Sequence, residues 1–67
     1  MSVAKHIEIT SDSSKSFEDA VQKGITTASK TVKGIRSAWI KDQQVLVSEN
    51  EVTTYRVNMK LTFVLAD

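Results

Sequence analysis

Apolar and polar residues alternate almost without a break near the end of the chain, in the stretch YRVNMKLTFVL at residues 55–65. The apolar positions of the alternation are Tyr55, Val57, Met59, Leu61, Phe63 and Leu65, and the polar ones are Arg56, Asn58, Lys60 and Thr62. Successive side chains of a strand point to opposite faces, so this stretch predicts a strand with one face toward a core. Its second face carries two cations and an amide.

A different spacing appears earlier in the chain, where apolar residues recur at three- and four-residue steps. The stripe consists of Phe17, Ala20, Val21, Gly24, Ile25, Ala28 and Val32. It predicts one amphipathic helix over about residues 16–33. Ser16, with Asp19 three positions later, has the form of a capping box at its start, and Gly34 is placed as the glycine that ends it.

Two further segments have strand character, residues 3–10 and residues 35–48. The second carries apolar residues at both parities, with Ala38, Ile40 and Leu46 on one side and Ile35, Trp39, Val45 and Val47 on the other. A polar turn, SENE, joins it to the last strand, which predicts an antiparallel hairpin. The predicted order is β-α-β-β, an α+β fold in a single domain over residues 1–67, with one helix packed on a three-stranded antiparallel sheet.

One helix can cover only one face of such a sheet. We expect Ser37, Trp39, Lys41 and Gln43 to share the uncovered face with Arg56, Asn58 and Lys60. A domain of 67 residues buries little surface, and the chain has no cysteine for a disulfide. The sequence therefore predicts that a ligand, another copy of the chain, or both cover this face.

Composition narrows the function classes. Nine basic and eight acidic residues give a net charge of +1, which makes nucleic acid an improbable partner because no strong attractive field is present. No apolar run approaches the length of a membrane span or a signal peptide, so we expect a cytoplasmic protein. No motif sets a nucleophile against a base, and the chain is predicted not to be an enzyme.

The whole pattern resembles the dodecin family. The resemblance rests on the SDSS turn after the first strand, the helix sequence EDAVQKGITTASKTVKGI and the aromatic Tyr55 that opens the last strand. It implies a hollow homododecamer that binds and stores flavins (FMN, FAD or riboflavin), stacked in pairs between tryptophans of symmetry-related subunits. Some members also bind coenzyme A, and one branch is associated with calcium instead of flavin.

Two positions depart from the flavin-binding pattern. Counting without a gap places Ser37 at the family's tryptophan and Arg56 at its flavin-contacting glutamine. Trp39 stands two residues further on, on the same face of the strand and roughly 7 Å away. Either a local shift returns Trp39 to the stacking position, or the flavin sandwich is absent, as in the calcium-associated branch, whose tyrosine-arginine pair this chain shares. The candidate ligand contacts are Trp39, Ser37, Arg56, Gln43 and Asn58.

Each candidate also has a purely structural interpretation. Trp39 is expected either to stack on a ligand or to seal a contact between subunits. For Arg56, the alternatives are a phosphate or carboxylate ligand, or an acidic residue of a neighbouring subunit, such as Asp42, Glu49 or Glu51.

The identity of any metal is left open by the sequence. Asp12, Asp42, Glu49 and Glu51 offer oxygen ligands for calcium, or are solvated carboxylates in turns. His6 is expected to be exposed. A third class of function, a small nucleic-acid or protein interaction module, would use the open sheet face to stack bases on Trp39.

Overall fold

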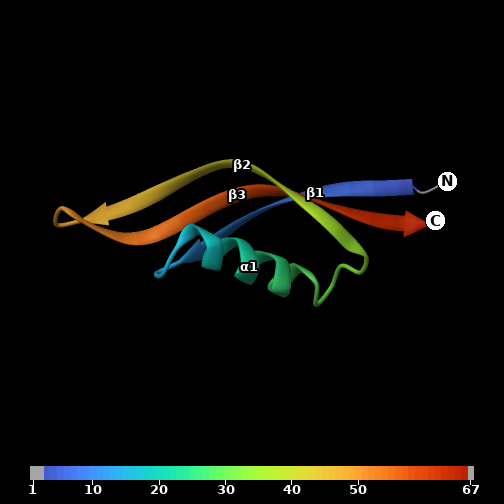
Figure 1. Ribbon diagram of the computed structural model, residues 1–67, viewed down its shortest axis with the longest axis horizontal. Coiled ribbons are helices and arrows are strands. Elements are labelled where there is room, and N and C mark those ends of the chain that lie inside the picture. The colour runs from blue at the N-terminus through green and yellow to red at the C-terminus, as the bar shows by residue number, and fades with distance from the viewer. Residues whose placement is uncertain (1–2, 67) are drawn as a thin grey trace.

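The computed structural model describes residues 3–66 and confirms the predicted order of elements (Figure 1). Strand β1 spans Val3–Ser13, helix α1 spans Phe17–Ala28, and strands β2 and β3 span Ile35–Ser48 and Glu51–Ala66. All pairings are antiparallel, in the order β1-β3-β2. The long alternating strand β3 is therefore central, with a partner on each side, and the sheet is open.

Strands β2 and β3 form a hairpin that extends beyond the helix (Figure 1). Glu49 and Asn50 join them with φ of 51° and 65°. Two consecutive positive φ angles are typical of the tight two-residue turn that matches the twist of paired strands. The chain is consequently elongated, 51 × 20 × 14 Å, with the hairpin tip at one end and the outer ends of β1 and β3 at the other.

The core lies between the helix and one face of the sheet. Its completely buried members are Ala20, Val57, Met59 and Leu61. Around these pack the partly buried residues Ile7, Ile9, Phe17, Val21, Ile25, Ala28, Ile35 and Ala38. The predicted apolar faces of α1 and β3 thus meet each other, which removes from water the surface that drives a fold of this size.

The start of the helix is close to the prediction. The Ser16 hydroxyl accepts a hydrogen bond from the Asp19 backbone N–H at 3.0 Å. The reciprocal bond of a capping box is replaced, because the Asp19 carboxylate accepts from the Ser13 hydroxyl at 2.6 Å instead. The Ser13 oxygen also accepts from the Lys15 N–H at 2.9 Å. Ser13 ends β1, three residues later than predicted, and links the strand to the helix cap.

The helix ends earlier than its apolar stripe predicted, at Ala28 rather than residue 33. Gly34 has a φ of 79°, but it lies directly before β2 and its carbonyl accepts the Val64 N–H of β3 at 3.0 Å, so it is not a helix-terminating glycine. Thr31 and Val32 are β-branched and weaken a helix. The intervening segment turns the chain from α1 into β2.

Strand β2 contains register shifts that the sequence pattern did not reveal. They lie between Ile35 and Ser37, Ile40 and Asp42, and Leu46 and Val47. The first explains why Ile35, predicted on the opposite side from Ala38, packs against the core with it. The second reverses the side of the residues that follow, so Val45 lies opposite Tyr55 on the helix side, and the predicted sides of Val45 and Leu46 are wrong. No helix within residues 3–66 is long and apolar enough to cross a membrane.

Candidate ligand-binding face

The face of the sheet opposite α1, called here the outer face, carries nearly all the candidate residues. Cross-strand register places the following residues on it: His6, Glu8, Thr10 and Asp12 of β1; Arg56, Asn58, Lys60 and Thr62 of β3; and Ser37, Trp39, Lys41, Asp42 and Gln44 of β2. Directly opposed residues in neighbouring strands point to the same face and contact each other. The outer face is therefore a series of polar rows that cross the three strands.

Trp39 is the largest exposed apolar group, with 71% of its surface accessible. It lies opposite Lys60, whose Nζ is 5.9 Å from the centre of the indole ring, close enough for a cation–π contact. A shallow hollow of about 210 Å³ is lined by Trp39, Lys41 and Lys60. The predicted position of Trp39 on the uncovered face is confirmed, and its free surface can stack on another flat ring.

Arg56 makes a paired contact within its own chain. Its Nε and Nη2 donate to Oδ1 and Oδ2 of Asp12 at 2.8 and 3.0 Å. Within its own chain Arg56 thus pairs with Asp12, while its contact with a ligand or with an acidic residue of a neighbouring subunit stays a prediction. Asp12 was missed because the first strand was predicted to end at residue 10, whereas in the structure Asp12 lies directly opposite Arg56. Hydrogen bonds from Arg56 lower the pKa of Asp12, and those to Asp12 raise the pKa of Arg56.

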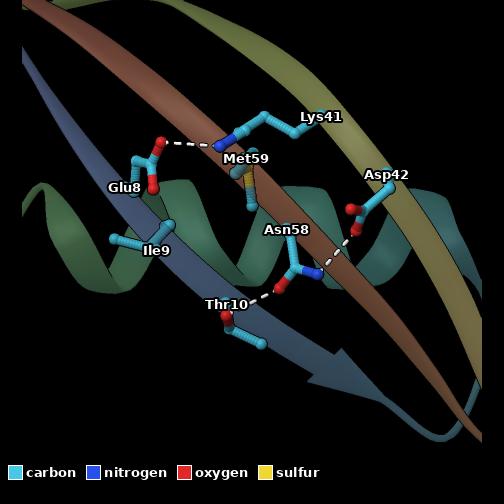
Figure 2. A pocket seen from close by; sticks show the side chains of 7 residues that line it. All are labelled: Glu8, Ile9, Thr10, Lys41, Asp42, Asn58 and Met59. Carbon is cyan, nitrogen blue, oxygen red and sulfur yellow. Dashed lines mark hydrogen bonds and ion pairs between the residues drawn. The ribbon is translucent and has the colours of Figure 1, made fainter.

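A polar cleft lies between two rows near the middle of the outer face (Figure 2). In one row, Thr10 Oγ1 donates to Asn58 Oδ1 at 2.7 Å, and Asn58 Nδ2 donates to Asp42 Oδ1 at 2.6 Å. In the other, Lys41 Nζ contacts Glu8 Oε1 at 2.8 Å. These side chains line a hollow of about 390 Å³, with Ile9 and Met59 also contributing. The Lys41 hydrogen bond lowers the pKa of Glu8, and Glu8 raises the pKa of Lys41.

Gln43 is not on the outer face, so its predicted position is wrong. The register shift at Lys41 places Gln43 opposite Val57, on the helix side, and directs both Lys41 and Asp42 outward. A bulge of this kind sets two residues of one strand against one of its partner. Ser37 lies where predicted, opposite Thr62, whose hydroxyl contacts Nδ1 of the exposed His6 at 2.9 Å.

The predicted oxygen ligands for a metal are spread along the molecule. Glu49 and Glu51 are exposed at the hairpin tip, whereas Asp12 and Asp42 are on strands rather than in turns. Residues 3–66 bring together no group of three or more histidine, cysteine, aspartate or glutamate side chains that could hold an ion.

Comparison with known proteins agrees with this geometry. The family model described as Dodecin matches residues 3–66. The chain belongs to the dodecin family. No curated protein matches the sequence.

Several solved dodecins share the fold. The dodecin of Streptomyces davaonensis superposes with a TM-score of 0.93 at 20% identity, covering 98% of this chain and 97% of its own. A variant of the Thermus thermophilus dodecin gives 0.92 at 25% identity over 100% of both chains. The calcium dodecin of Mycobacterium tuberculosis, described as a calcium-chelating immunodominant antigen with a novel calcium-binding site, gives 0.82 at 31% identity, covering 91% of this chain and 87% of that one. The resemblance identified from the sequence is thus confirmed.

Proposed function

We propose that copies of this chain form a hollow homododecamer that binds and stores a small planar ligand, a flavin such as FMN, FAD or riboflavin. The observation that carries the proposal is Trp39, which stands 71% exposed on a sheet face that no element of residues 3–66 covers. A lone tryptophan held out from a strand offers a rigid flat surface for stacking on an aromatic ring. Trp39 lies two residues beyond Ser37, and Ser37 occupies the position of the family's tryptophan.

Self-association is supported by exposed apolar side chains at the two ends of the elongated molecule. Val45, Val47 and Val52 are 39%, 60% and 48% exposed near the hairpin tip, and Val3 and Leu65 are 56% and 60% exposed at the other end. Only four apolar residues within 3–66 are completely buried. A core this small gains stability when further apolar surface is covered by other copies.

The proposed mechanism is binding without chemical conversion. The ring of the ligand stacks on Trp39, and a second copy of the chain closes the other side. Stacking against an electron-rich indole shortens the excited state of a flavin, and this limits its photochemistry. The lysines beside Trp39 face the carbonyl oxygens of such a ring, which accept hydrogen bonds but carry no proton to donate.

Titration with flavin, followed by quenching of flavin fluorescence, tests the proposal. We expect saturable binding to a particle near twelve times the chain mass of 7.4 kDa, measured by gel filtration with light scattering. Trp39→Ala should abolish binding and leave the mass unchanged, whereas Trp39→Phe, which keeps a flat ring, should retain part of the affinity. A stable single chain at micromolar concentration, or full affinity in Trp39→Ala, would contradict the proposal. Coenzyme A can be tested in the same titration as a competitor.

Calcium is the second candidate, favoured by the 31% identity with the Mycobacterium tuberculosis calcium dodecin. Glu8, Asp12 and Asp42 all lie on the outer face, where a second copy could complete a coordination shell. In that case the preparation does not quench flavin, and calcium raises the unfolding temperature by mass action. Magnesium at equal concentration is the control, and an equal shift with both ions would indicate a general charge effect instead.

A further inference from the structure

The hollow at Trp39 and the polar cleft adjoin each other on the outer face, with Lys41 between them. Lys41 lines both hollows, and the two lie on neighbouring rows of the outer face. The Trp39–Lys60 row and the Asp42–Asn58 row are separated by two residues of β3. This spacing corresponds to roughly 7 Å along the strand, within reach of a chain of a few carbon atoms attached to a ring on Trp39.

The cleft is rich in hydrogen-bond acceptors. Glu8 uses only Oε1, toward Lys41, and Asp42 uses only Oδ1, toward Asn58, in the hydrogen bonds found among residues 3–66. Each carboxylate therefore keeps a second oxygen for a donor from outside. Thr10 already donates its hydroxyl hydrogen to Asn58, and this leaves the Thr10 oxygen as a further acceptor. Such a lining suits a ligand that brings hydroxyl hydrogens.

The charges of the cleft disfavour an anion. Its lining includes two carboxylates, Glu8 and Asp42, and one ammonium, Lys41, which gives a net charge of −1. Lys41 is already bonded to Glu8 at 2.8 Å, so it is only partly available to a phosphate. The second cation nearby, Lys60, is held over the indole ring of Trp39 and not in the cleft.

We propose that this cleft selects the substituent of the bound ring, and that the preferred ligand is a planar heteroaromatic ring carrying a neutral polyol chain, as in riboflavin. The inference rests on the proposed function, because the ring must first stack on Trp39. The ring carbonyls face the lysines and the hydroxyls of the chain donate to the free oxygens of Asp42 and Glu8. A terminal phosphate weakens binding, since it meets two carboxylates at short range.

Three flavins with the same ring test this selection: riboflavin, lumiflavin, in which a methyl group replaces the polyol chain, and FMN, in which the chain ends in phosphate. Titration of the intact assembly should give riboflavin about tenfold tighter binding than lumiflavin, the size of effect expected from one or two hydrogen bonds to charged groups. FMN should bind several-fold more weakly than riboflavin, and added salt should reduce that difference because it screens the repulsion.

Asp42→Asn is the decisive variant. Its amide oxygen can still accept from Asn58 and preserve the row, while the free oxygen of Asp42 is replaced by an amide donor. We expect the riboflavin advantage over lumiflavin and the penalty on FMN both to shrink, with lumiflavin affinity unchanged. Glu51→Gln removes one charge at the exposed hairpin tip and should change neither ratio.

The outcomes separate the two claims. Equal affinity for riboflavin and lumiflavin, tighter binding of FMN than riboflavin, or ratios unaffected by Asp42→Asn would overturn the selection by the cleft and leave flavin binding at Trp39 in place. If none of the three flavins binds, the proposed function and the selection fall together.

Discussion

Gly24→Ala sets two opposing effects against each other at the contact between α1 and β1. An alanine in a helix interior is favoured over glycine by about 1 kcal/mol. Its methyl group, however, would lie 2.6 Å from Met59 Cε, 3.0 Å from Ser11 Cβ and 3.2 Å from Ile9 Cδ1. Met59 is completely buried, so its Cε can move only by repacking the core around it, and Ser11 Cβ is fixed to the backbone of β1.

The magnitude follows from that crowding. Overpacking a well-packed core costs about 1–3 kcal/mol, and three tight contacts place Gly24→Ala in the upper half of this range. After the gain in helix propensity is subtracted, the variant should lose about 1–2 kcal/mol of unfolding free energy. The steric cost therefore outweighs the conformational benefit.

Chemical denaturation followed by circular dichroism measures this difference. Variants must be compared at equal chain concentration, because association shifts the apparent stability. Thr27→Ala, at an exposed position of the same helix, is the control and should gain about 0.5 kcal/mol from propensity alone. In a Met59→Ala background, the cost of Gly24→Ala should fall, since one of its three close contacts is gone. If Gly24→Ala stabilises the protein as much as Thr27→Ala does, the packing argument is refuted.

Two further predictions concern the helix cap and the acidic limb of stability. Ser16→Ala removes the acceptor of the Asp19 N–H and should lower the unfolding free energy by about 1 kcal/mol, whereas Ser16→Asn should restore most of it; no loss would show that water replaces the cap. The pKa of Asp12 is depressed by Arg56, so its contribution to stability is present above the ordinary pKa of 3.8 and is lost as the pH falls through the lower folded-state pKa. In Asp12→Asn, the unfolding temperature should therefore fall less steeply as the pH is lowered to about 2 than it does in the unmodified protein. An unchanged slope of unfolding temperature against pH would contradict the pairing of Asp12 with Arg56.

The periodic segments of the sequence were sufficient to predict the fold. Burial on one face gives β3 a strict period of two and α1 a stripe at three and four residues, and these two patterns fix which surfaces meet. Trp39 was placed correctly because it precedes the second register shift of β2 and its parity could be counted from Ala38. Element ends were less predictable, since Gly34 leads into β2 instead of ending the helix and β1 continues to Ser13.

The parts of the candidate site that escaped prediction depend on long-range pairing. Asp12 and Arg56 are 44 residues apart, and nothing local in either segment indicates that they are opposed. Gln43 was assigned to the outer face because a strand without bulges keeps a constant parity. Strand β2 has apolar residues on both sides, so its pattern gave no sign of where the parity changes.

The register shift at Lys41 has a consequence for binding. Without it, Lys41 and Asp42 would point to opposite faces, and a carboxylate would be directed toward the helix side of the sheet. With it, Lys41 pairs with Glu8 while Asp42 accepts from Asn58, on the same face and in adjacent rows. One extra residue in β2 therefore both creates the polar cleft and keeps a charge away from the completely buried Val57, which Asp42 would otherwise lie opposite. A shift of this kind re-aims side chains at the cost of one unpaired position, and here it sets the acceptors of the cleft beside the indole of Trp39.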